Sequence, residues 1–342
     1  MKLKQSLKNK KFVKTNKKLE GTREINAVVK LSKKEKECID ILVEKLLDED
    51  NCQLIFRGES MKSAFEKSGV DSYYPKKNDE YKFSKHGESI FFIGSKANSY
   101  LFKTDEVDFP IELDGTKDEL FKGIFEEFKQ NIQHPTLKNE AKFKEYFLNG
   151  KSSHFCGIIN PLDEKDKITI KYYYLWLLHV IGETKYKYYS NFLSTTKDYK
   201  IAKDFGKEEI VYVGWVPRPI KERCVYLGSL IQARQRLESL GLPVYMDEPY
   251  PTEEEISLIG GFFSHYILGI YNIPNKEFLI NDHLLDKKML DMIADGFSEM
   301  IIKHGIGIDQ SNFANSEFLK ISQYKRYNIF IKDKGYFDRK LY

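Results

Sequence analysis

The order of the apolar patterns constrains the fold of this chain more than any other feature of its sequence. Apolar residues recur at helical spacing over much of the first half, and Tyr172–Gly182 is a dense apolar segment typical of a buried helix. Short runs rich in β-branched and aromatic residues, such as Ile210–Val216, dominate the second half. Few strands alternate cleanly with helices, so the pattern favours an α+β fold over a doubly wound parallel sheet.

Local start and stop signals divide the chain into expected elements. Ser32 with Glu35, and Thr116 with Glu119, match the capping box that opens a helix. The other expected helices are Leu120–Phe128, Lys138–Leu148, Asp198–Phe205, Ser229–Leu240 and Leu284–His304. The expected strands are Cys52–Gly58, Asn191–Thr196, Ile210–Val216, Cys224–Leu227, Glu255–Phe263 and His265–Asn272.

Composition and missing motifs exclude several classes of protein. Hydrophobic residues make up 41% and charged residues 31% of the 342 residues, which is typical of a globular chain. No apolar run is long enough to cross a bilayer and none follows the basic N-terminus, so we expect a cytoplasmic protein without a membrane partner. The four cysteines are far apart and form no CxxC pair, so no metal site is expected. Neither a Rossmann glycine motif nor a P-loop is present in the sequence.

Residues 1–31 form a lysine-rich arm that precedes a domain spanning residues 32–342. Residues 1–18 hold eight lysines and no acid, whereas the rest of the chain holds 47 basic and 51 acidic residues. A basic arm on a slightly acidic body is typical of tails that contact nucleic acid or an acidic protein. A solvated, frayed terminus is the alternative interpretation. We expect a helical N-terminal extension, and insertions between residues 60 and 190.

Arginine is scarce, and its placement draws attention to one residue. Only eight of the 55 basic residues are arginine, and Arg57 is the sole arginine between Glu24 and Pro217. A guanidinium offers a planar fork of donors that matches phosphate or carboxylate, which a lysine ammonium does not. Arg57 is therefore a candidate ligand-binding residue, with a surface salt bridge as the alternative.

Three short segments containing Arg57, Ser194 and Glu255 stand out as a set. They read Phe-Arg-Gly from position 56, Phe-Leu-Ser-Thr-Thr-Lys-Asp from position 192, and Glu-Glu-Glu from position 253. Each is weak alone, but their order and spacing resemble the R-S-E clade of ADP-ribosyltransferases, the cholera-toxin-like group. That family has an aromatic-Arg motif, a Ser-Thr-Ser strand and a Glu-x-Glu segment on a split β-sandwich that binds NAD⁺. The chain departs from the pattern at Thr196, where serine is usual, and its triple acid leaves open the register of the Glu-x-Glu pair within residues 253–255.

The resemblance implies a site that cleaves the nicotinamide–ribose bond of NAD⁺ through an oxocarbenium-like state, which a nearby carboxylate stabilises. It assigns that carboxylate to Glu255, while Glu253 orients or deprotonates the acceptor. Arg57 holds the diphosphate or ribose, and Ser194 holds Glu255 in its productive rotamer. The full set expected to bind NAD⁺ is Phe56, Arg57, Gly58, Phe192, Ser194, Thr195 and Phe205. Phe192 and Phe205 are equally well explained as core residues.

The expected function is that of an NAD⁺-dependent mono-ADP-ribosyltransferase, an enzyme without a metal. Glu-x-Glu is typical of family members that modify protein arginine, whereas the lysine-rich arm and the many aromatics favour an RNA acceptor. RNA is slightly favoured, as in the RNA-modifying toxins of toxin–antitoxin–chaperone anti-phage systems, and a neutralising antitoxin would then be a partner. The alternatives are a protein-arginine transferase effector, plain NAD⁺ hydrolysis, and a non-catalytic nucleic-acid-binding module with a degenerate transferase fold.

Overall fold

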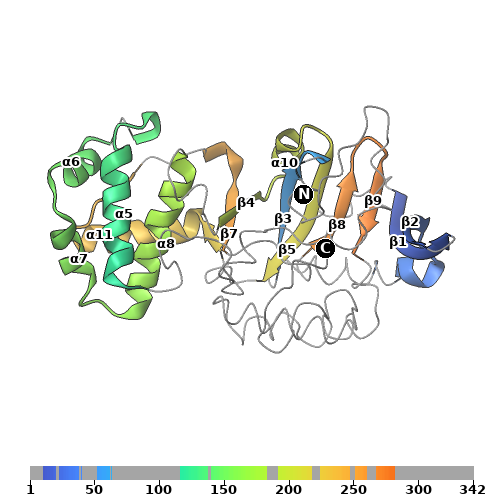
Figure 1. The fold of residues 1–342 in the computed structure, drawn as a ribbon, viewed down its shortest axis with the longest axis horizontal. Coiled ribbons are helices and arrows are strands. Elements are labelled where there is room, and N and C mark those ends of the chain that lie inside the picture. The colour runs from blue at the N-terminus through green and yellow to red at the C-terminus, as the bar shows by residue number, and fades with distance from the viewer. Residues whose placement is uncertain are drawn as a thin grey trace. The chain divides into compact units, whose positions relative to one another are not determined.

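A computed structural model of the chain describes residues 11–20, 23–37, 40, 52–61, 63, 116–137, 140–182, 192–217, 224–246, 251–259 and 267–281 (Figure 1). The chain divides into two compact units. The first comprises residues 1–104, 194–223 and 260–342, and the second comprises residues 105–193 and 224–259. The described residues combine helices with a mixed β-sheet, which confirms that the chain contains both kinds of element, as expected from the sequence.

The first unit is built on a sheet whose strands lie in the order β2-β1-β9-β8-β5-β3-β4. These strands are β1 (Lys11–Glu20), β2 (Arg23–Lys30), β3 (Cys52–Glu59), β4 (Phe192–Thr196, whose first two residues belong to the second unit), β5 (Ile210–Pro217), β8 (Ile267–Asn272) and β9 (Glu277–Ile280). Strand β5 is buried on both faces, because Tyr212, Val213 and Trp215 are each at most 1% exposed. Its apolar and aromatic sequence is therefore the sequence of a central strand.

The expected helical N-terminal extension is wrong for residues 11–30, which form the antiparallel pair β1 and β2. Strand β1 also pairs in parallel with β9, and the rings of Phe12 and Phe278 meet edge to face with centroids 5.4 Å apart. Lys11 bonds to Glu277 over 2.6 Å, and Val13 is 1% exposed. The lysine-rich arm is thus anchored from Lys11 onward, so a frayed terminus is also wrong for the described part.

The second unit is mainly helical and contains a core of aromatic rings. Its helices are α5 (Asp118–Asn131), α6 (Ala141–Asn149), α7 (Ser152–Ile159), α8 (Glu164–Ile181) and α11 (Leu227–Ser239), with an antiparallel pair of strands, β6 (Cys224–Tyr226) and β7 (Glu255–Ile259). The rings of Phe125, Phe128, Phe147 and Tyr174 are linked by contacts with centroids 4.8–6.3 Å apart. Edge-on and tilted aromatic pairs of this kind stabilise a core beyond their buried area.

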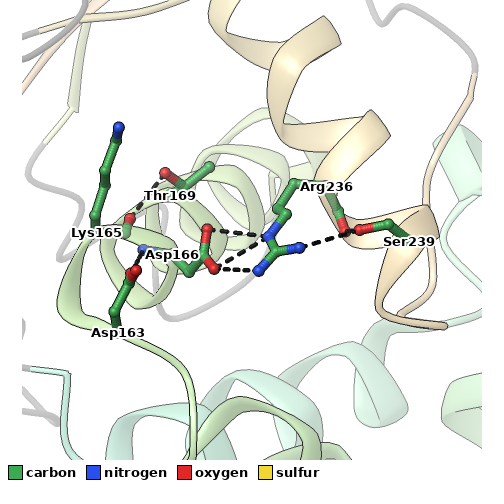
Figure 2. Close-up of polar contacts among 6 residues, drawn as sticks. All are labelled: Asp163, Lys165, Asp166, Thr169, Arg236 and Ser239. Atoms are coloured by element: carbon green, nitrogen blue, oxygen red, sulfur yellow. Dashed lines mark hydrogen bonds and ion pairs between the residues drawn. The ribbon is translucent and has the colours of Figure 1, made fainter.

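Polar contacts at the ends of the helices lock α8 to its neighbours. Figure 2 shows the guanidinium of Arg236 on α11 facing the carboxylate of Asp166 in the first turn of α8. The Nε atom of Arg236 lies 3.0 Å from both carboxylate oxygens, and its Nη2 also bonds Oδ2. In the buried part of the unit, the Tyr174 hydroxyl donates to the Pro243 carbonyl over 2.8 Å. No helix among the described residues has the length and apolar character needed to cross a membrane.

One expected capping box is confirmed and the other is wrong. The Ser32 hydroxyl accepts from the Glu35 amide, and the Glu35 carboxylate accepts from the Ser32 amide, as a capping box requires. Thr116 instead donates its hydroxyl to Glu164 over 2.6 Å, and α5 begins two residues later without a side-chain cap. Several expected segments lie outside the described residues. They are the helix after Ser32 beyond residue 40, the strand segments beyond Ile259 and before Ile267, the helix Leu284–His304, and most of the expected insertion before residue 116.

Candidate functional site

In the first unit, the structure brings the arginine motif and the serine motif onto neighbouring strands. Strands β3 and β4 pair antiparallel, with Phe56 opposite Thr196. The guanidinium of Arg57 reaches across, and its Nη1 donates to the backbone carbonyl of Ser194 over 2.5 Å. Two motifs that are 137 residues apart in the chain are therefore joined by a direct hydrogen bond.

Arg57 is not part of a surface salt bridge, because its partner is buried. The Nε atom of Arg57 donates to Oε1 of Glu59 over 2.7 Å, and Nη2 also bonds that oxygen. The side chain of Glu59 is 6% exposed and that of Arg57 is 17% exposed. The second carboxylate oxygen of Glu59 accepts from the hydroxyl of Ser63 over 2.8 Å. Glu59 and Ser63 were not identified from the sequence, although an acid two residues after Arg57 on a strand shares its face.

Tyr212 completes the polar surroundings of Arg57. It lies opposite Arg57 in the register of β3 and β5, and its side chain is fully buried. Burial and the negative charge of Glu59 raise the pKa of Tyr212 well above its usual value, so the hydroxyl stays protonated. Within the described part of the chain this hydroxyl has no hydrogen-bond partner. A buried donor without a partner beside a guanidinium fits the acceptor-rich chemistry of a phosphate or ribose group.

Phe56 and Gly58 lie on the opposite face of β3 from Arg57, because successive strand residues alternate. Phe56 is 2% exposed and packs edge to face on Tyr199 of α10 (Tyr199–Phe205), with ring centroids 5.8 Å apart. A Cβ added at Gly58 would lie 1.6 Å from the carbonyl oxygen of Ala202. Both residues therefore have a packing role in holding α10 against β3, whatever their relation to NAD⁺.

The serine motif continues from β4 into α10 through local hydrogen bonds. The Asp198 amide donates to the hydroxyl of Thr196 over 3.0 Å, and the Asp198 carboxylate caps α10 by accepting from the Lys200 amide. Thr195 is 4% exposed. Thr196, where the family pattern has serine, therefore accepts a hydrogen bond that stabilises the turn between β4 and α10.

The two phenylalanines that flank the serine motif differ in burial. Phe192 is 7% exposed and lies in the second unit, where its ring is 6.1 Å from that of Tyr172 and 5.9 Å from that of His179. Phe205, at the end of α10, is 60% exposed. The core interpretation therefore holds for Phe192 and is wrong for Phe205.

In the second unit, the acidic motif forms a pair of carboxylates around a strained residue. Glu253 ends a 3₁₀ turn (Pro251–Glu253), and Glu255 begins β7. Between them Glu254 has a φ of 44°, a left-handed conformation that non-glycine residues rarely adopt and that clusters at functional sites. Burial and then the charge of Glu255 raise the pKa of Glu253. A carboxyl group with a raised pKa beside a second carboxylate is the arrangement used for general acid–base chemistry.

Ser257 holds the carboxylate of Glu255 in place. Its hydroxyl donates to Oε1 of Glu255 over 2.7 Å, and Ser257 is fully buried. The family resemblance implies this role for Ser194, and Ser257 was not identified from the sequence. The two-residue period of the strand is the signal that identifies it, because Ser257 shares the face of Glu255.

Arg57 and Ser194 belong to the first unit, and Glu253 and Glu255 belong to the second, so the meeting of all three motifs stays a prediction. The first cluster offers donors for an anionic or hydroxyl-rich ligand, and the second offers an oriented carboxylate and a base. No group of His, Cys, Asp and Glu side chains in the described ranges has the geometry to hold a metal ion. Comparisons with protein-family models, curated proteins and solved structures found no match for this chain.

Proposed function

We propose that this chain is an NAD⁺-dependent mono-ADP-ribosyltransferase of the R-S-E type, built on a split β-sandwich. The observation that carries the proposal is the hydrogen bond from the Arg57 guanidinium to the Ser194 carbonyl. It joins two of the three motifs on which the resemblance rests. The Glu253–Glu255 pair, with Ser257 bonded to Glu255, supports the third part of the proposal.

The proposed reaction transfers ADP-ribose from NAD⁺ to a nucleophile on a macromolecule. The bond between C1′ of the ribose and the nicotinamide nitrogen breaks, and neutral nicotinamide leaves with the bonding electron pair. A new bond forms between C1′ and the acceptor atom, whose proton passes to Glu253 or to water. Glu255 accepts a hydrogen bond from the ribose and stabilises the positive charge that develops on it.

The binding step falls to the first unit. The guanidinium has five N–H groups, and within the described residues Glu59 and Ser194 take three of them, which leaves two for the diphosphate or ribose oxygens. The hydroxyl of Tyr212, which has no partner among the described residues, is a further donor on the same face of the sheet. Donor groups gathered in this way match a ligand whose exposed atoms are mainly acceptors.

We place RNA ahead of protein as the acceptor, because the chain has many lysines near its N-terminus, which can neutralise phosphates, and is rich in phenylalanine and tyrosine, whose rings stack on bases where they are exposed. Anchoring of Lys11 and Lys14 by Glu277 and Glu35 reduces the number of free lysines in the arm. The cellular role that fits such an activity is that of a cytoplasmic toxin in anti-phage defence, held in check by an antitoxin.

The test is incubation of the purified protein with NAD⁺ labelled in the adenylate group and with a cell extract, followed by nuclease or protease digestion. Label that survives protease and is lost on RNase treatment supports RNA as the acceptor. Label lost on protease treatment would assign the activity to protein instead. Free ADP-ribose without labelled macromolecule would show plain hydrolysis, and unconsumed NAD⁺ would refute the proposal.

Matched variants connect the activity to the two clusters. Glu255→Gln should lower the rate by about 10²–10³-fold while NAD⁺ still binds, because it removes the charge aligned with the ribosyl cation. Arg57→Ala should weaken NAD⁺ binding roughly 10- to 100-fold, since a hydrogen bond to a charged group contributes about 1.5–3 kcal/mol. Glu254→Gln is the control, because this neighbouring acid is exposed and should leave the rate near that of the wild type.

A further inference from the structure

The carboxylate of Glu59 is bonded on both of its oxygens within the first unit. Oε1 receives the Nε and Nη2 atoms of Arg57, and Oε2 receives the Ser63 hydroxyl. Ser63 is itself held by the segment that follows β3, because its amide donates to the Ser60 hydroxyl over 3.1 Å. The result is a short relay from the turn after β3, through Glu59, to the guanidinium.

This relay fixes the plane of the guanidinium, which a single contact would leave free to rotate. The Glu59 carboxylate accepts hydrogen bonds from Nε and Nη2 of the guanidinium, and the Ser194 carbonyl accepts one from Nη1. The two N–H groups on Nη1 and Nη2 that bind no described residue are therefore constrained in direction before any ligand arrives. A donor pair that is already oriented loses little conformational freedom when it binds a phosphate or ribose oxygen.

The pair formed by Arg57 and Glu59 is also close to electrically neutral. The guanidinium thus contributes directed hydrogen bonds more than net positive charge. An ordinary stabilising ion pair would predict that loss of the Glu59 charge leaves anion binding unchanged or strengthens it. If Glu59 instead orients the guanidinium, loss of the Glu59 charge should weaken anion binding.

We propose that Glu59, held by Ser63, is a positioning residue that directs two N–H groups of Arg57 toward an oxygen-rich group of the ligand, and we identify that group as the diphosphate of NAD⁺. The proposal rests on the proposed function. It assigns a task in binding to two residues that do not themselves touch the ligand.

The experiment measures NAD⁺ affinity by calorimetry and NAD⁺ consumption by initial rates for the full chain. Glu59→Gln should raise Kd and KM for NAD⁺ about 10-fold or more, with kcat changed less than about threefold, because a charge-assisted bond that sets the geometry is lost. Ser63→Ala should raise both constants about three- to tenfold while the ion pair is kept. If circular dichroism shows that Glu59→Gln does not fold, Ser63→Ala alone tests the proposal.

Two controls separate positioning from general weakening of the unit. Glu209→Gln is matched to Glu59→Gln, because the Glu209 carboxylate accepts from the Met61 amide over 2.5 Å in the same turn region without contacting Arg57. It should leave Kd unchanged. In an Arg57→Ala background, Glu59→Gln should cause no further rise in Kd, since it acts through the guanidinium.

The outcomes distinguish failure of the positioning role of Glu59 from failure of the proposed function. Wild-type NAD⁺ binding combined with an unchanged or lower Kd in Glu59→Gln would overturn the positioning role alone. A further rise in Kd in the Arg57→Ala background would do the same. Absence of NAD⁺ binding by the folded wild type would overturn both the proposed function and this inference.

Discussion

Gly58→Ala tests whether the close approach of α10 to β3 supports the arginine cluster. A Cβ at this position would lie 1.6 Å from the Ala202 carbonyl oxygen and 2.5 Å from the Gly206 amide nitrogen. These are backbone atoms, and that carbonyl already accepts from the Gly206 amide at the end of α10. The helix would have to move by about 2 Å to restore an ordinary contact, which places the substitution at the severe end of overpacking.

The expected cost is about 3 kcal/mol or more of unfolding free energy, the upper range for overpacked positions. Relief of glycine entropy in the unfolded chain opposes this by only about 0.4–1 kcal/mol. Gly157→Ala is the matched control, because a Cβ there meets no atom within 4 Å inside α7. It should stabilise the chain by about 0.5–1 kcal/mol, as expected for removing glycine from a helix interior.

Tryptophan fluorescence can follow each unit separately, because the chain has two tryptophans and each unit contains one. Trp215 is buried in the first unit and Trp176 in the second. In a Trp176→Phe background, Gly58→Ala should lower the urea midpoint reported by Trp215 by on the order of 1 M or more. An unchanged midpoint, or a gain like that of Gly157→Ala, would refute the packing argument.

Two further predictions concern the second unit. Ser257→Ala should lower kcat about 10- to 100-fold with little change in KM, because Glu255 loses the hydrogen bond that orients it. Ser257→Thr keeps the hydroxyl and should restore most of the rate. Equal kinetics for the wild type and Ser257→Ala would contradict the assignment. Hydrogen bonding by Lys122, and then by Asn160, lowers the pKa of Asp118 to about 2 from 3.8. The stabilisation by the ionised Asp118 carboxylate is present above pH 3.8 and is lost as the pH falls toward 2. The difference in unfolding free energy between the wild type and Asp118→Asn should therefore shrink over that range. A difference that does not depend on pH in urea titrations would contradict this prediction.

The elements that the sequence predicted correctly depend on neighbours within a few residues. The capping box of Ser32 and Glu35 closes over three residues, and the dense apolar segment Tyr172–Gly182 lies in α8. The expected strand Asn191–Thr196 corresponds to β4, and Asp198 caps the helix that follows it. Periodicity and capping are local properties, so they can be inferred without knowing the rest of the fold.

The elements that were missed or wrongly predicted depend on distant partners. The lysines of β1 carry no β signal of their own, and the strand is fixed by pairing with β9, where Lys11 meets Glu277 across 266 positions. Thr116 follows the capping-box pattern, but Glu164 competes successfully for its hydroxyl. Helix α7 was not predicted, and its apolar face is defined by contacts such as that of Phe155 with Phe125.

For the candidate site, the sequence by itself determined which residue types are present, their order, and the two-residue period that places Glu59 beside Arg57 and Ser257 beside Glu255. Only the tertiary structure decided that Arg57 bonds the Ser194 carbonyl and that its ionic partner is buried. It also decided that Gly58 is needed for contact with α10. The physical reason is that spacing along a strand sets the face of a side chain, whereas its partners and its exposure depend on which distant segments fold against it.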